Sequence, residues 1–307
     1  MRLSIITINY NNLQGLIKTV DSVLLQTFHD FEWIIIDGGS TDGSKEYIEQ
    51  LAKDLATRNW LTHKFSLSCY SADDNVKENF NFFIPDTSAS VRSLYWCSEP
   101  DKGIYNAMNK GITIAHGDYL NFMNSGDSYH EKETLISVFS SLIPINAGVV
   151  YCNYYDIYND GKVLPQILPE ELDFAFLMKR PINHQSTFIK KDLFSNYKYD
   201  EKYKIVADGK AFMKWMIEGV CFYHLDVFVA DFYMGGIHNQ EPDLINLERQ
   251  KIIEECIPKG IYNVASQLEE QKLIWEEYPY LKDTLDIYKR HKFKRKLITL
   301  LIKILKC

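Results

Sequence analysis

The chain has 307 residues, 46% of them hydrophobic and 24% charged, enough for a large core in one α/β domain or two small ones. Its formal net charge is −7, and an acidic body argues against binding bulk nucleic acid. No segment approaches the roughly 20 apolar residues that a membrane-spanning helix needs. The six cysteines form no C-x-x-C pair and follow no secretory leader, so we expect reduced thiols and a cytoplasmic location.

Strands and helices alternate in the first part of the chain. The isoleucine-rich run Leu3–Ile8 predicts a strand buried on both faces, and apolar residues at helical spacing predict a helix over 13–24. A second buried strand, Trp33–Ile36, is followed by a turn and a helix over 45–55. This order predicts βαβ units and a parallel sheet.

The stretch 58–93 is irregular and rich in Asn, Asp, Ser and Phe, and we predict that it is an insertion. Regular elements return after it. We expect strands at Leu94–Cys97, Tyr119–Met123, Gly148–Tyr154 and Val227–Tyr233, helices over 104–115, beyond Glu131 and over 209–218, a hairpin through Asn159-Asp160-Gly161, and a helical, polar segment over 244–288.

Three acidic turns directly follow predicted strands. They are Asp37-Gly38-Gly39-Ser40, Glu99-Pro100-Asp101-Lys102-Gly103 and Asn124-Ser125-Gly126-Asp127. Asp and Gly also make good turns without any ligand, so one such turn would mean little. Ligands of open α/β sheets bind outside the carboxyl ends of the strands, and three acidic turns in succession therefore indicate a shared ligand.

Two common nucleotide-binding motifs are absent from the sequence. No G-x-G-x-x-G follows the first strand, and there is no Walker A lysine loop. A nucleotide bound at these turns would therefore be held by carboxylates, a metal ion and backbone groups.

Four segments together resemble family 2 glycosyltransferases, most closely the colanic-acid and capsule branch. They are SIITINYNN, QTFHDFEWIIIDGGSTDGS, WCSEPDKGIYNAMNKGITIAHGDYLNFMNSGD and INHQSTF, and the resemblance covers residues 1–240 apart from 58–93. It implies a GT-A fold of the α/β class, with a Rossmann-like, mostly parallel central sheet flanked by helices. Residues 1–130 would form the nucleotide-sugar-binding half and 131–240 the acceptor-binding half, with 241–307 as a helical extension.

The resemblance also assigns residues to the nucleotide-sugar pocket. Asp37 matches an acid that contacts the nucleoside, Gly38 stands where the family has a second carboxylate, and Asp101 matches a further nucleotide-contacting acid. The full predicted set is Thr7, Asn9, Tyr10, Asp37, Gly38, Asp101, Lys102, Gly103, Asn106, Asn124, Ser125 and Gly126.

A divalent cation, Mg²⁺ or Mn²⁺, is expected at Asp127, which matches the last acid of the family's Asp-x-Asp motif. Such an ion neutralises the charge that develops on a departing diphosphate, and Mg²⁺ commonly uses only one or two protein carboxylates. Asn124 and Gly126 stand where acids often occur, so Asp127 would be the principal ligand. Its alternative role is to cap a following helix. His238 could complete the metal shell or touch the diphosphate.

The predicted second half contributes an acid and a His-Gln pair. Sugar transfer with inversion needs a base on the acceptor hydroxyl, and Asp208 matches the position of the family's catalytic acids. Helix capping is the alternative for Asp208, and the two roles could coexist. We expect His184 and Gln185 to shape the donor or acceptor pocket through hydrogen bonds, the alternative being a purely structural role.

The segment 289–307 contains eight basic residues and no acidic ones, and its apolar residues recur at helical spacing. A basic amphipathic helix of this kind lies on an anionic membrane surface. We therefore expect peripheral contact with the cytoplasmic face of the inner membrane and a lipid-linked glycan acceptor. Docking of this helix on its own domain or on a partner subunit is the alternative.

The sequence thus predicts an inverting, metal-dependent glycosyltransferase of bacterial surface polysaccharide biosynthesis that uses a nucleotide diphosphate sugar. One rival is a catalytically silent relative that binds the donor, which the reduced metal motif would fit. A sugar-phosphate nucleotidyltransferase is disfavoured, because that class needs a Gly-rich, Arg-containing loop where this chain has Thr7–Asn12.

Overall fold

The computed structural model describes residues 3–65, 92–180, 182–236 and 241–260, with seven further positions between 262 and 277. The chain divides into two compact units, Met1–Ile252 and Ile253–Cys307. The predicted tail over 289–307 and His238 lie outside the described residues. None of the helices in the described part is long and apolar enough to span a membrane.

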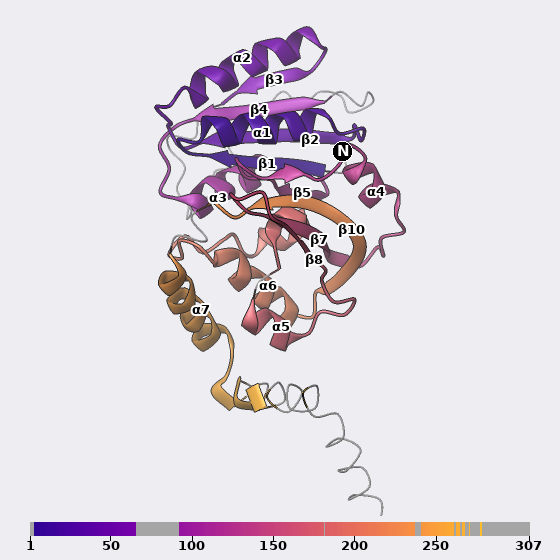
Figure 1. Ribbon diagram of the computed structural model, residues 1–307, viewed down its shortest axis with the longest axis vertical. Coiled ribbons are helices and arrows are strands. Elements are labelled where there is room, and N and C mark those ends of the chain that lie inside the picture. The colour runs from indigo at the N-terminus through magenta and orange to yellow at the C-terminus, as the bar shows by residue number, and fades with distance from the viewer. Residues whose placement is uncertain are drawn as a thin grey trace, which may run out of the picture. The chain divides into compact units, whose positions relative to one another are not determined.

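Five parallel strands form the first half of a ten-stranded sheet. They lie in the order β3 (Leu61–Lys64), β4 (Ser93–Ser98), β2 (Phe31–Asp37), β1 (Leu3–Asn9) and β5 (Tyr119–Phe122) (Figure 1). Every residue of β1 and β2 is buried, as expected for central strands that are covered on both faces.

Three helices connect these strands: α1 (Leu13–Leu24), α2 (Ser44–Thr57) and α3 (Ile104–Ile114). Asn12 caps α1, because its side-chain oxygen accepts a hydrogen bond of 3.1 Å from the Gly15 amide. The apolar stripe of α1 is buried, and Figure 1 shows this helix lying across one face of the parallel strands.

The second half of the sheet is mixed. Strand β9 (Thr187–Lys190) is antiparallel to both β5 and β7 (Ala147–Ile157), and β7 pairs in parallel with the long β10 (Cys221–Tyr233). The remaining elements are β6 (Ser128–Tyr129), β8 (Val163–Gln166), α4 (Thr134–Ser140), α5 (Phe174–Lys179), α6 (Ala207–Ile217), α7 (Pro242–Cys256) and the 3₁₀ helices η1 (His184–Ser186) and η2 (Lys191–Ser195).

The register of the parallel strands aligns three polar residues at the carboxyl edge of the sheet. Asn9 of β1 pairs with Asp37 of β2, and Asp37 pairs with Ser98 of β4. Strand β5 follows on the other side of β1, and the turn that starts at Asn124 leaves the sheet at the same edge. The three predicted acidic turns therefore begin side by side.

A buried carboxylate at the opposite edge of the sheet fixes the turn before β5. Glu32 is fully buried and accepts hydrogen bonds from the Ser4 hydroxyl, the His116 amide and ring, and the Gly117 amide. A Cβ at Gly117 would lie 2.5 Å from the Ser4 amide nitrogen, so only glycine fits there. Glu32 thus helps to hold β1, β2 and the turn before β5 together.

The α/β fold class is confirmed, and the predicted strands and helices of residues 1–57 and 94–233 are present with small shifts in their ends. The segment 58–93 is not wholly an insertion, because β3 adds a parallel strand next to β4. Strand β10 is longer than predicted, and bulges near Leu225 and Phe228 interrupt the alternation that would have revealed its first part.

We predict that Glu32→Ala lowers the free energy of unfolding by about 3 kcal/mol, because Ser4, His116 and Gly117 lose a buried acceptor. Urea unfolding measures this change. Glu131→Ala, at an exposed glutamate, is the control and should change the unfolding midpoint little. Equal midpoints for the two variants would contradict the role given to Glu32.

Candidate functional site at the carboxyl edge of the sheet

Asp37 is the centre of a hydrogen-bond network at the end of β2. Its carboxylate is fully buried and accepts four hydrogen bonds from three residues. The donors are Asn9 Nδ2 (2.8 Å), Ser40 Oγ (2.5 Å), Ser40 N (3.0 Å) and Ser98 Oγ (2.6 Å). Asp37 therefore fixes the first acidic turn and joins the ends of three strands.

The turn between β1 and α1 connects the first acidic turn to the third. The Asn11 amide donates to Ser40 Oγ (2.8 Å), and Asn11 Oδ1 accepts from the Thr41 amide (2.9 Å). Asn12 Nδ2 donates to the carbonyl of Ser125 (3.1 Å). Asn11 has a φ of +46°, a left-handed conformation that asparagine tolerates better than most residues.

The second acidic turn approaches the first at Gly38. A Cβ at Gly38 would lie 2.5 Å from Asp101 Oδ2 and 3.2 Å from the Tyr10 ring, so these three residues are close neighbours. Burial raises the pKa of Asp101, and the nearby Asp37 charge raises it further. The missing side chain at position 38 thus makes room for the carboxylate of Asp101.

The residues after Asp101 are held by local and long-range hydrogen bonds. The Gly103 amide donates to Asp101 Oδ1 (2.9 Å), and the Lys102 amide donates to Asn106 Oδ1 (3.2 Å). Asn106 Nδ2 donates to Glu201, which lies before α6 in the second half of the sequence (2.9 Å). Asn106 is 6% exposed, so it orders the turn and offers little surface to a ligand.

The third acidic turn is fastened to α1. Thr19 Oγ1 donates to the carbonyl of Asp127 (2.6 Å) and accepts from the Gly126 amide (3.0 Å), and Lys18 Nζ donates to the carbonyl of Gly126 (3.2 Å). Strand β6 follows Asp127 directly, so Asp127 does not cap a helix.

The Asp127 carboxylate lies between two elements of the second half. Gln185 Nε2 donates to Oδ2, and the Tyr233 amide at the end of β10 donates to Oδ1 (2.9 Å). The side chain is largely buried, and burial raises the pKa of Asp127 to about 6, although both donors oppose the increase.

Asp208 is also buried, but its surroundings favour the charged form. It lies in the first turn of α6, whose N-cap is Val206, and accepts hydrogen bonds from His184 Nδ1 (2.8 Å), Gly209 N (2.8 Å) and Tyr105 Oη (3.0 Å). Burial would raise the pKa of Asp208, yet the His184 imidazole and the two other donors hold it below its ordinary value.

His184 and Gln185 join these two carboxylates. His184 binds Asp208 through Nδ1, and its Nε2 lies 3.0 Å from Asn124 Nδ2. Gln185 binds Asp127. Asn183 holds both residues in η1, because its Oδ1 accepts from the Gln185 and Ser186 amides. The structure thus brings Asn124, Asp127, His184, Gln185 and Asp208 into one cluster.

The cluster contains oxygen atoms of the kind that a hard divalent cation prefers. Asn124 Oδ1 and Gln185 Oε1 are buried and have no hydrogen-bond partner among the described residues, and each oxygen of Asp127 accepts one hydrogen bond there. Mg²⁺ prefers such oxygens and completes its shell with phosphates and waters. Among the described residues, no group of three or more His, Cys, Asp or Glu side chains could hold a metal, so any such site depends on a ligand as well.

Not every predicted residue is accessible to a ligand at this edge. Thr7 is fully buried in β1, where it accepts a hydrogen bond from Trp33 Nε1 (3.0 Å). Tyr10, in contrast, is 66% exposed. The networks also contain residues that were not predicted as site residues, among them Asn11, Asn12, Ser40, Ser98 and Tyr105. Asn11, Asn12 and Ser40 stood inside motifs after strands, whereas nothing in the sequence links Tyr105 to Asp208.

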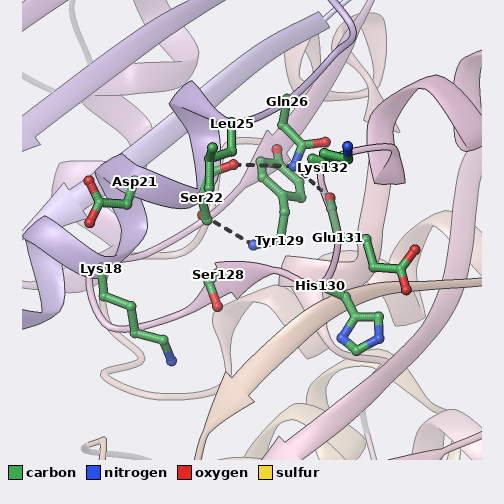
Figure 2. Close-up of a pocket in the computed structure, with 10 residues that line it drawn as sticks. All are labelled: Lys18, Asp21, Ser22, Leu25, Gln26, Ser128, Tyr129, His130, Glu131 and Lys132. Carbon is green, nitrogen blue, oxygen red and sulfur yellow. Dashed lines mark hydrogen bonds between the residues drawn. The ribbon is translucent and has the colours of Figure 1, made fainter.

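A groove of about 240 Å³ lies beside the third acidic turn, between α1 and the segment 128–132 (Figure 2). Its wall begins at Ser128, the residue after Asp127, but none of the four predicted acids lines it. Figure 2 shows the Ser22 hydroxyl bonded to the Tyr129 amide within the groove. The lining residues are Lys18, Asp21, Ser22, Leu25, Gln26, Ser128, Tyr129, His130, Glu131 and Lys132.

Comparison with known sequences identifies glycosyltransferases. Residues 4–66 match the model of glycosyl transferase family 2. The chain is 27% identical over 261 residues to a PGL/p-HBAD biosynthesis glycosyltransferase of Mycobacterium bovis, covering 80% of this chain and 82% of that protein. An uncharacterized glycosyltransferase of Mycobacterium tuberculosis is 31% identical over 140 residues, 45% of this chain and 39% of the relative.

Two solved structures with a similar fold are complexes with a nucleotide or a nucleotide sugar. Staphylococcus aureus TarS 1–349 in complex with UDP superposes with a TM-score of 0.57 at 15% identity, over 85% of this chain and 68% of that chain. The mannosyltransferase PcManGT of Pyrobaculum calidifontis, in complex with GDP-Man and Mn²⁺, gives 0.50 at 14% identity, over 74% of this chain and 56% of its own. The predicted GT-A fold is confirmed.

We predict that Asp127→Asn stabilises the metal-free protein at neutral pH. In the folded protein the pKa of Asp127 is raised from its ordinary value of 3.8 to about 6. The protonated carboxyl therefore stabilises the fold fully at pH values below 3.8, and this stabilisation is lost as the pH rises through about 6. Two pKa units correspond to about 3 kcal/mol. Asparagine avoids this loss, because Gln185 can turn its amide and accept a hydrogen bond with Oε1.

Urea unfolding in EDTA between pH 4.5 and pH 8 measures the difference between the two proteins. It should be small at the acidic end and grow to about 3 kcal/mol above pH 7. A variant that is less stable than the wild type at pH 7.5 would show that the protein stabilises the ionised carboxylate.

Proposed function

We propose that this chain, a glycosyltransferase of family 2, moves one sugar from a nucleotide diphosphate donor to a glycan hydroxyl with inversion at the anomeric carbon. The observation that carries the proposal is the pair His184 and Gln185, which joins Asp208 to the Asn124–Asp127 turn. A base for the acceptor and a site for the leaving diphosphate must lie close together in such a transfer.

The nucleoside end of the donor is proposed to bind at Gly38, Tyr10 and Asp101. Tyr10 is exposed and can pack against a base, and Asp101 offers a half-buried carboxylate beside it. Asp37 has all its hydrogen bonds within the protein, so it would act by fixing the turn that the nucleoside meets. TarS and PcManGT form complexes with UDP and GDP-Man, which supports a nucleotide sugar as the donor.

In the proposed reaction, the acceptor oxygen attacks the anomeric carbon on the face opposite the diphosphate. The bond from that carbon to the phosphate oxygen breaks, and the nucleoside diphosphate leaves with the bonding electrons. Asp208 takes the proton of the acceptor hydroxyl. Its pKa is held low, so the carboxylate is ionised at neutral pH before the acceptor arrives.

The departing diphosphate is proposed to lie against Asp127, with Asn124 and Gln185 contributing oxygens and His238 as a further candidate ligand. Mg²⁺ or Mn²⁺ at this position would neutralise the charge that develops on the leaving group. Lys18 and Thr19 hold the backbone of the turn in place whether or not the donor is bound.

The acceptor is proposed to be a lipid-linked glycan of bacterial surface polysaccharide biosynthesis. The basic amphipathic segment 289–307 supports membrane contact, and the mycobacterial relative is named for a biosynthetic role, PGL/p-HBAD biosynthesis. Assignment to the colanic-acid or capsule branch stays a prediction, because the two relatives described above do not carry that name.

We expect the purified protein to release a nucleoside diphosphate from one member of a panel of UDP-, GDP- and dTDP-sugars. Release should require Mn²⁺ or Mg²⁺, stop in EDTA, and fall at least about 100-fold in Asp127→Ala, because the charge on the leaving group is then less well neutralised. Release that is equal with and without EDTA would argue against the cation. Binding of a sugar nucleotide without any release would favour a catalytically silent relative.

We expect Asp208→Asn to reduce transfer by about 10²–10⁴-fold, because the amide cannot accept the acceptor proton. Donor affinity, measured by calorimetry, should stay within about twofold, since Asp208 lies away from the Asp37 and Asp101 turns. Asp200→Asn is the matched control: Asp200 is a half-buried acid near α6 that pairs with Lys210. Transfer at the wild-type rate in Asp208→Asn would remove Asp208 from the mechanism.

A further inference from the structure

We infer that His184 is a positioning residue of the transfer reaction: it orients the ionised Asp208 and couples this base to the turn that holds Asp127. The inference rests on the proposed function and adds a role for one side chain within it. Its evidence is a continuous chain of contacts from Asp208 through His184 to Asn124.

Both ring nitrogens of His184 are engaged. Nδ1 donates its proton to Asp208 Oδ2 at 2.8 Å, and Nε2 lies 3.0 Å from the side-chain amide of Asn124. The imidazole therefore passes the orientation of the Asn124 amide on to the carboxylate of the base.

The imidazole has little freedom to turn. Its side chain is 15% exposed, and the Phe122 ring lies edge-on to it, with centroids 6.4 Å apart and an interplanar angle of 88°. The backbone of η1 is fixed by Asn183, as described above. A side chain held in this way can define which oxygen of Asp208 remains for the acceptor.

The groups around Asp208 show why losing His184 should matter. Besides His184 in η1, Asp208 faces Tyr105 of α3, Arg249 of α7, and Tyr199, which precedes α6. Burial acts against the ionised carboxylate, and the hydrogen bond and charge interaction with His184 are the first effects that counter it. Without His184, the carboxylate would therefore hold its proton at higher pH.

At its other end, this series of contacts reaches the third acidic turn, Asn124–Asp127. The backbone carbonyl of Asn124 accepts from the Asp127 amide (3.1 Å) and from Thr19 Oγ1 (3.1 Å). A change in the position of the turn on donor binding would move Asn124, and with it the ring of His184. Through the same contacts, a donor bound in the correct position would orient the carboxylate of Asp208.

Three variants separate the two contacts. In His184→Asn, the amide nitrogen takes the place of Nδ1, so the bond to Asp208 survives and the link to Asn124 is lost. Asn124→Ala also removes only that link. His184→Phe removes both contacts while keeping a planar ring. The readouts are kcat, the acid limb of the pH profile of kcat/KM, and the pKa of Asp208 from carboxyl ¹³C NMR.

We expect His184→Phe to lower kcat by about 100-fold through misplacement of the base, and to move the acid limb and the Asp208 pKa upward by about one unit. His184→Asn and Asn124→Ala should lower kcat by several-fold and leave the acid limb where it is. His130→Phe is the control, because it removes another His–Asp pair with the same 2.8 Å bond, to Asp231 on β10, and should leave kcat unchanged.

The inference would be overturned if His184→Phe left both the acid limb of the kcat/KM profile and the pKa of Asp208 at their wild-type values. His184 would then have a structural role alone. A shifted acid limb in His184→Asn would overturn the division between the two contacts. The NMR titration needs no donor or acceptor, so it tests the contact between His184 and Asp208 even if no sugar nucleotide is turned over. Absence of turnover in the wild type would instead count against the proposed function.

Discussion

The buried carboxylate of Asp37 is the interaction on which the arrangement of the site depends. A charge removed from water must be saturated by donors, and Asp37 receives four hydrogen bonds from residues at the ends of β1 and β4 and in the turn after β2. The register that aligns Asn9, Asp37 and Ser98 makes this possible. Because the strand ends are locked together, the turns that leave them have defined positions, and Gly38 can lie directly against Asp101.

Two other buried aspartates have surroundings that shift their pKa values in opposite directions. Asp127 has few donors for its degree of burial, and its pKa rises to about 6, so its negative charge is stabilised best when a cation is present. Asp208 receives three donors, one of them His184, and its pKa falls. Titratable groups whose surroundings shift their pKa values apart are suited to different roles, and we propose that these roles concern the leaving group for Asp127 and the acceptor for Asp208.

The sequence predicted the parallel half of the fold, and it predicted that the acidic turns begin at one edge of the sheet, because both depend on local patterns. Apolar runs followed by Asp-Gly turns mark where strands such as β2 end, and parallel strands bring those ends to one edge. Contacts between distant segments left no such pattern. Nothing local indicates that Glu32 holds the turn at Gly117, or that β3 lies within the irregular stretch 58–93. The pairing of His184 with both Asn124 and Asp208 was hidden for the same reason, because the three residues lie in separate elements.

The two halves of the sheet are joined at the site by side chains from the antiparallel part. Strand β9 is inserted between β5 and β7, and it directly follows η1, so His184 and Gln185 must lie beside the turn that leaves β5. Strand β10 ends at Tyr233, whose amide reaches Asp127 from the other side. Asp127 is thus completed only when both halves are folded against each other. In the proposed mechanism, a nucleotide could meet the Asp37 and Asp101 turns with the first half alone, but the coupling of the leaving group to the base would require the second.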